Sequence, residues 1–148
     1  YAGHGRRTHA LMLPLRHTGL WRVLSVVILV IVLVATLSPA VWFFDSKAKA
    51  LFWFHNVDKL LHALTFVALT VWFTGLYERR VWWLTALGLV LFGSLVEFFQ
   101  LQVGYRTADW RDVAANTAGI IIGLTVAAAG LGGWVLRVED WYSRQNRN

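Results

Sequence analysis

Four long runs without Asp, Glu, Lys or Arg constrain this chain more than any other feature of its sequence. They cover residues 23–44, 60–77, 81–96 and 113–136. A helix needs about 20 mostly apolar residues to cross the hydrocarbon core of a bilayer, and roughly 17–25 are tolerated. The third run reaches this length when Glu97 and Phe98 complete its end. Of all residues, 57% are hydrophobic, against about 45–50% in soluble domains. The sequence therefore predicts an all-α integral membrane protein.

We predict a bundle of four transmembrane helices in a single membrane domain, residues 1–148. The expected helices span residues 20–38, 58–77, 81–100 and 112–136. The first apolar run is long for a cleaved signal peptide and aromatic residues follow it at 42–44, so we expect it to be retained. With four helices both termini share one side, which holds nine of the 14 basic residues. The positive-inside rule then predicts cytoplasmic tails, 1–18 and 138–148, in a bacterial inner membrane.

The segment between the first two helices, residues 40–57, places aromatic side chains on both sides of a short charged centre. Amphipathic rings are favoured in the headgroup layer, so this pattern suits a segment that lies along the membrane surface. A plain loop with ordinary aromatic anchors explains the same pattern. Both interpretations stay open at this point.

The absence of cysteine excludes disulfides, thiolate metal sites and a cysteine nucleophile. The net charge of +6 records topology in a membrane protein, so we expect membrane lipids as partners and no nucleic acid. We expect no cofactor. His62 is the only histidine at membrane depth, and a bis-histidine haem would lack its second ligand.

Polar residues gather at the outer end of the last three predicted helices. The second helix begins with Asp58, Lys59 and His62, and the third ends with Glu97 and Gln100. The fourth begins with Asp112 and Asn116, preceded by Arg106 and Asp109. Three helices from distant parts of the sequence thus carry polar side chains to the same depth. Ionisable residues within a membrane usually face the bundle interior and pair with one another, so we expect one extracytoplasmic polar pocket.

The helical spacing supports this pocket. The pairs Asp58/His62 and Asp112/Asn116 are separated by four positions, and Glu97/Gln100 by three, so each pair shares a helix face. Small residues continue the same faces, and they are Gly93, Gly119 and Gly123. The last two form a GxxxG pair, which allows helix backbones to approach closely in lipid. Because the inner halves of the helices lack ionisable residues, a proton or ion path across the membrane is not expected.

Three motifs in register resemble the VanZ-like family of small bacterial membrane proteins. They are D-K-L-L-H at 58–62, E-F-F-Q at 97–100 and R-T-A-D-W-R-D-V-A-A-N-T-A-G at 106–119. The resemblance spans roughly residues 58–123 and implies that the polar residues named above are the family's signature positions. The family takes its name from a teicoplanin-resistance protein that lowers susceptibility to a lipid-tailed glycopeptide. Antibiotic resistance is therefore implied by the resemblance, and the first helix carries no signature of the family.

Two functions suit such a pocket. In the first, Lys59, Arg106 and Arg111 beside an aromatic rim bind the headgroup of an anionic lipid or amphiphile, because arginine suits phosphate and carboxylate groups. These cations would otherwise only neutralise the acids. In the second, the protein is an enzyme acting on a lipid-linked substrate, with Glu97 or Asp112 as general base and His62 as acid. The sequence has no GxSxG motif and no cysteine to supply a nucleophile, so the catalytic residues stay unknown.

Two further alternatives remain. His62 could bind a divalent metal ion with Asp58, Glu97, Asp109 and Asp112, but one histidine and the nearby cations disfavour this, and we predict no metal. The protein could also be a structural or accessory subunit of a larger membrane complex. Five tryptophans could then contact neighbouring helices, although anchoring at the lipid interface is the simpler interpretation. They are Trp21, Trp72, Trp82, Trp83 and Trp134.

Overall fold

The computed structural model describes residues 11–38, 47–102 and 110–145, with side chains from residue 59 onward in the second of these segments. Most of these residues are helical, and beyond one isolated bridge between Met12 and Tyr77 they form no β-strand. The elements are α1 (Thr18–Leu37), α2 (Lys47–Leu76), η2 (Arg79–Val81), α3 (Trp82–Gln102), α4 (Trp110–Val126), η3 (Ala127–Leu131) and α5 (Trp134–Gln145). Helix α2 begins earlier than predicted. Residues 39–46 and the side chains of 47–58 lie outside the description, so the interfacial segment stays a prediction.

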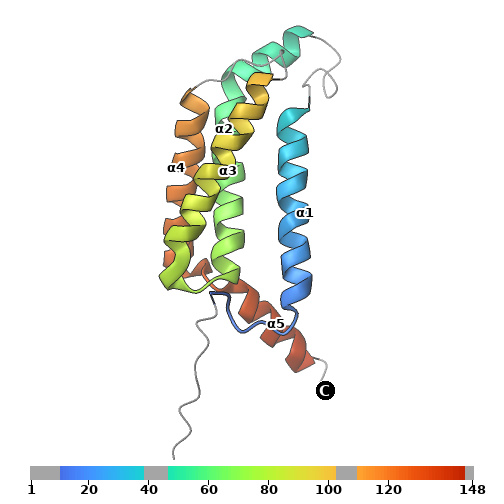
Figure 1. Cartoon of the computed structure of the whole chain (residues 1–148), viewed down its shortest axis with the longest axis vertical. Helices are drawn as coiled ribbons and strands as arrows, with labels where there is room; N and C mark the ends of the chain where they lie inside the picture. The colour runs from blue at the N-terminus through green and yellow to red at the C-terminus, as the bar shows by residue number, and fades with distance from the viewer. Residues whose placement is uncertain (1–10, 39–46, 103–109, 146–148) are drawn as a thin grey trace, which may run out of the picture.

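The helices α2, α3 and α4 form a tight group, α1 runs alongside it, and α5 lies across one end (Figure 1). Four stretches within the described residues are long and apolar enough to cross a membrane: Thr18–Leu37, Lys59–Leu76, Arg79–Gln102 and Trp110–Gln145. Large apolar side chains such as Ile31 and Leu91 are about 60% exposed on the outside of the bundle. Such a surface suits lipid, and the described part of the chain is therefore a helical bundle of the membrane type.

The last crossing helix is shorter than the predicted 112–136. Helix α4 continues into the short π-helix η3. The helix then ends, because Gly130 and Gly133 take φ angles of 137° and 68°. Only glycine adopts such positive φ angles at little cost. The crossing segment is therefore 110–131. The residues predicted as a polar tail from 138 instead form most of α5, which lies across the end of the bundle (Figure 1).

The predicted glycine pair brings α4 against α2. A Cβ atom at Gly119 would overlap the carbonyl oxygen of Ala63, and one at Gly123 would lie 2.5 Å from Cβ of Thr70. Neither helix can move closer, and no larger residue fits without separating them. Beside this contact, the middle of the bundle is filled by Phe66, Leu69, Leu89 and Ile120. The close approach fixes the depth at which the polar residues of α2 and α4 meet.

The opposite end of the bundle, which we call the arginine end, carries Arg16, Arg22, Arg79, Arg80 and Arg137. The chain before α1 pairs with the end of α2 there, since Leu13 N–H donates to the Leu76 carbonyl and Glu78 N–H to the Leu11 carbonyl. The first and last described segments therefore lie at the same end of the bundle (Figure 1).

Three of the tryptophans pack on one another at the arginine end. Trp21, Trp72 and Trp134 have ring centroids 5.6–5.8 Å apart. The indole N–H of Trp72 donates to the Ser25 hydroxyl, and that of Trp134 to the Val71 carbonyl. These rings make helix–helix contacts within the protein. The simpler prediction of lipid anchoring is wrong for this trio, because their polar atoms and faces are used inside the bundle.

Candidate functional site

The predicted polar residues that the structure describes do converge. We call Lys59 and His62 of α2, Glu97 of α3, and Asp112 and Asn116 of α4 the polar cluster. His62, Glu97, Asp112 and Asn116 are each only 3–6% exposed, whereas the Lys59 side chain is 39% exposed. The cluster is thus a buried group of polar residues, all but Asn116 ionisable, and its lysine is partly exposed.

Helix periodicity and glycine packing bring these side chains together. On α4, Asp112 and Asn116 share a face, and Gly119 continues it into contact with α2. On α3, Gly93 lies one turn from Glu97, and a Cβ there would lie 3.1 Å from Nδ2 of Asn116 and 3.0 Å from Cζ of Phe66. Glycine at position 93 therefore leaves the space that the Asn116 amide occupies.

Three contacts define the geometry of the polar cluster. The Lys59 ammonium donates to Asp112, with Nζ 3.1 Å from Oδ1. The Nδ1 atom of His62 lies 3.1 Å from Oδ1 of Asn116 and 3.9 Å from Oε1 of Glu97. If Nδ1 carries the proton it donates to Asn116, and the imidazole then keeps its place beside the Glu97 carboxylate. Every contact crosses between two helices.

Gln100 lies apart from these contacts. It is 2% exposed, and its amide donates to the carbonyl oxygen of Thr36 near the end of α1 at 3.1 Å. Gln100 therefore ties α3 to α1, a partner that sequence alone did not suggest. A backbone carbonyl becomes available there because the last four carbonyls of a helix have no partner within it.

Some predicted site residues lie outside the description. Arg106, Asp109 and the side chain of Asp58 belong to this group. Arg111 is exposed at the start of α4, with its guanidinium carbon 5.9 Å from the centroid of the Trp110 ring. The structure therefore places two of the three predicted cations, Lys59 and Arg111, on the helices that bear the cluster.

Three members of the cluster could hold a metal ion. His62, Glu97 and Asp112 each offer a ligand atom, and these atoms lie within 4.8 Å of one another. Opposite ligands of a divalent cation lie about 4.4 Å apart when bonds are about 2.2 Å long, so a small closure would suffice. The Lys59 ammonium, however, already occupies an oxygen of Asp112. The absence of a metal stays a prediction.

The same geometry permits acid–base chemistry. A buried imidazole 3.9 Å from a buried carboxylate can exchange a proton with a bound group directly or through a water molecule. Asp112 is held by Lys59 and Asn116 by His62. The residues that would carry such chemistry, Glu97 and His62, thus sit in fixed surroundings.

A family model described as VanZ/LLP1 matches residues 17–131. The chain belongs to this family. The VanZ/LLP1 match takes in α1 and ends at η3, so it covers all four crossing segments and leaves out α5. It reaches further toward the N-terminus than the three motifs at 58–119, which did not include the first helix. No curated protein and no solved structure matches the chain.

Sequence analysis missed Glu139 of α5. This buried residue accepts hydrogen bonds from the backbone N–H of Arg16 and of His17 and from the indole of Trp21, at 2.7, 3.1 and 2.8 Å. Helix α1 begins at Thr18, and no side chain of its own caps it. Glu139 thus holds the backbone just before α1 from a distant part of the chain, outside the VanZ/LLP1 match. Apolar residues at 134, 135, 138, 141 and 142 recur at helical spacing between polar ones, and this was the available signal for an amphipathic helix.

Proposed function

We propose that this VanZ/LLP1 protein binds the headgroup of an anionic lipid or amphiphile at the polar cluster. One observation carries the proposal: buried ionisable side chains from three helices converge within 4.8 Å at one end of the bundle. Ionisable residues within membrane segments are costly and usually mark functional sites. The middle of the bundle, lined by Phe66, Leu69, Leu89 and Ile120, is apolar. A pocket at one end favours binding over passage across the membrane.

The cations suit an anionic headgroup. Lys59 is the most exposed member of the polar cluster, and Arg111 lies one residue before Asp112 on the outside of α4. A phosphate or carboxylate approaching from the surface would meet Lys59 first. Charge-assisted hydrogen bonds to such groups are roughly twice as strong as neutral ones. Asp112 would hold the Lys59 ammonium in position for that contact.

A purely stabilising role explains the cluster less well. Apolar residues of similar volume often replace a buried ion pair with no loss of stability. In lipid the cost of burying polar groups is higher than in a soluble core. Keeping several such groups at one place therefore favours a ligand.

We place the polar cluster on the extracytoplasmic side of a bacterial inner membrane. The arginine end then faces the cytoplasm with both described ends of the chain, as the positive-inside rule requires. The bound molecule would belong to the outer leaflet. The family's teicoplanin-resistance label fits a ligand of this kind, a lipid-tailed amphiphile, and a susceptibility assay on cells expressing the protein tests it.

Lipid retention tests the proposal. The protein is purified from membranes in a mild detergent, and its bound lipids are counted by native mass spectrometry. Lys59→Met should lose anionic lipid about tenfold, which corresponds to roughly 1.4 kcal/mol. Arg137→Gln, an exposed cation at the arginine end, should change nothing. Equal retention by wild type and Lys59→Met, with both proteins folded, would overturn the proposal.

The His62–Glu97 geometry favours a second candidate, an enzyme that acts on a lipid-linked substrate. Both residues are buried, and the atoms Nδ1 and Oε1 are 3.9 Å apart. A proton could pass between this pair and a substrate held by Lys59. Purified wild-type protein would then turn over a lipid-linked phosphate, and Glu97→Gln would stop turnover while still retaining the lipid. No turnover by wild-type protein leaves binding as the function.

A further inference from the structure

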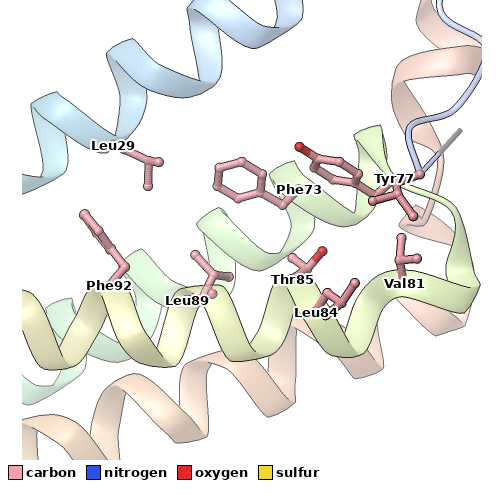
Figure 2. A pocket seen from close by; sticks show the side chains of 10 residues that line it. Leu29, Phe73, Tyr77, Val81, Leu84, Thr85, Leu89 and Phe92 are labelled. Carbon is pink, nitrogen blue, oxygen red and sulfur yellow. The ribbon is translucent and has the colours of Figure 1, made fainter.

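A cavity lined by none of the polar cluster extends toward the arginine end of the bundle. It has a volume of about 350 Å³ and lies between α1, α2 and α3, within the usual range of about 300–1,000 Å³ for small-molecule sites. Figure 2 shows its wall, which is mostly aliphatic and aromatic. The lining residues include Leu29, Phe73, Leu84, Leu89 and Phe92, and no member of the polar cluster.

Gly88 lines this cavity, and no packing contact within the protein requires a glycine there. A Cβ atom at Gly88 would meet no atom within 4 Å, whereas at Gly75, Gly119 and Gly123 it would clash with a neighbouring helix or ring. A glycine in the middle of a helix costs about 1 kcal/mol relative to alanine. Packing explains this cost at Gly75, Gly119 and Gly123. At Gly88 the missing side chain only enlarges the cavity.

The surroundings identify what can fill it. Leu84, Leu87 and Leu91 on the same helix are 39–62% exposed, so this face of α3 meets the hydrocarbon part of the bilayer. The cavity is partly open, and its wall offers only the hydroxyl groups of Tyr77 and Thr85 as polar side-chain groups. Water does not fill apolar cavities. An acyl chain from the surrounding lipid matches both the wall and the depth.

Positive charge lies where the cavity meets the arginine end. Leu11, Tyr77 and Val81 line it there. Val81 follows Arg79 and Arg80 in the turn η2, and the Nε atom of Arg22 lies 3.4 Å from the sulfur of Met12, the residue after Leu11. Glu78 pairs with Arg80 at 2.6 Å. Three arginines against one acid favour an anionic headgroup, because basic residues near a membrane surface attract anionic lipids.

We propose that this cavity holds one acyl chain of an anionic phospholipid from the leaflet at the arginine end, with its phosphate against Arg22 and Arg79. The site uses other residues and the other end of the bundle, so it does not depend on the function proposed for the polar cluster. Its selectivity comes from the headgroup, since any saturated chain suits the apolar wall. The lipid would join α1, which has fewer contacts with α2 and α3 than α4 has, to the rest of the bundle.

The test fills the cavity from within. The protein is placed in nanodiscs of mixed phosphatidylglycerol and phosphatidylethanolamine. Native mass spectrometry then counts the lipids that stay bound when the protein is released from the nanodisc. Gly88→Leu should lower retained phosphatidylglycerol about tenfold, because its side chain displaces methylene groups whose burial holds the lipid. Gly19→Leu is the matched control, since a Cβ at Gly19 also meets nothing within 4 Å and Gly19 does not line the cavity. Thr85→Trp provides a second filling variant if Gly88→Leu does not fold.

The headgroup is tested separately. Arg22→Gln combined with Arg79→Gln should abolish the preference for phosphatidylglycerol over phosphatidylethanolamine, and Arg137→Gln should preserve it. Lys59→Met should leave lipid retained at this site unchanged, which distinguishes it from the polar cluster. Retention of the same lipid in the same amount by both filling variants would overturn the proposal. An unchanged headgroup preference in the double arginine variant would overturn the assignment to an anionic phospholipid.

Discussion

The Nδ1 atom of His62 lies 3.1 Å from the Oδ1 atom of Asn116, across 54 positions of sequence. Both side chains are buried, and this contact joins α2 to α4 within the polar cluster. The same Nδ1 atom lies 3.9 Å from Oε1 of Glu97. A side chain with an acceptor oxygen at position 116 is thus what orients the histidine.

Replacing Asn116 by Leu removes this acceptor while keeping a similar volume. Loss of this acceptor for a buried imidazole costs about 1–3 kcal/mol, so the unfolding temperature in detergent should fall. Retention of anionic lipid at the polar cluster should fall with it. Thr117→Val is the control, because Thr117 is exposed and its hydroxyl bonds only to the Val113 carbonyl of its own helix. Equal unfolding temperatures for the two variants would show that the His62–Asn116 contact contributes nothing.

The close contact between α4 and α2 predicts a strong effect of side-chain size at position 119. Gly119→Val should separate the two helices, because a Cβ there overlaps the Ala63 carbonyl. Overpacking of this kind costs about 1–3 kcal/mol, sometimes more. Thermal unfolding in detergent measures the loss, and Gly19→Val, which meets no neighbour, should show much less. A stable Gly119→Val protein would mean that the helices are not held this closely in the membrane.

Neutralising either partner of the Lys59–Asp112 ion pair should lower stability, but by different amounts for the two residues. Asp112 is buried and Lys59 is partly exposed, so Asp112→Asn should cost less stability than Lys59→Met, which leaves a buried carboxylate without this cation. A double-mutant cycle on unfolding free energies gives the coupling, expected at about 1 kcal/mol because the lysine is partly solvated. A coupling of zero would show that the pair contributes nothing to folding.

The crossing helices and the convergence of the described polar residues could be predicted from sequence because both follow from simple periodicities. Charge-free runs of membrane length fix the helices, and spacings of three or four residues fix which polar side chains share a face. The close contact at Gly119 was predictable for the same reason. The partners within the cluster were not: that His62 contacts Asn116 at 3.1 Å and Glu97 only at 3.9 Å depends on side-chain geometry rather than spacing.

The end of the last crossing helix could not be predicted from sequence, for a physical reason. Glycine in an apolar run serves equally as a packing residue or as a turn, and only the positive φ angles of Gly130 and Gly133 distinguish the two uses. The prediction of one helix through 136 followed from hydropathy alone. Once the chain turns, Glu139 of α5 reaches the start of α1. The two sites are more than 100 residues apart in sequence, so no local pattern predicts this contact.

That contact makes stability depend on pH at the arginine end. Burial alone would raise the pKa of Glu139, but the hydrogen bonds from Arg16, Trp21 and His17 outweigh it and hold the pKa below its ordinary value of 4.5. Because the folded-state pKa is lowered, the carboxylate contributes its full stabilisation above about pH 4.5, and this is lost as the pH falls through the lowered pKa.

At neutral pH the lost charge-assisted bonds should therefore lower the free energy of unfolding of Glu139→Gln by about 1–3 kcal/mol. The variant should then unfold at a lower temperature than wild type. The difference should shrink as the pH falls from about 4.5 through the lowered folded-state pKa, because the unfolded wild-type chain then binds a proton that the folded protein takes up only at lower pH. Asp140→Asn is the matched control, since Asp140 is the exposed neighbour on the same helix. Unfolding temperatures in detergent at neutral pH and near pH 3.5 decide the matter. If the gap between wild type and Glu139→Gln stays constant with pH, the charge of Glu139 does not hold α5 against α1.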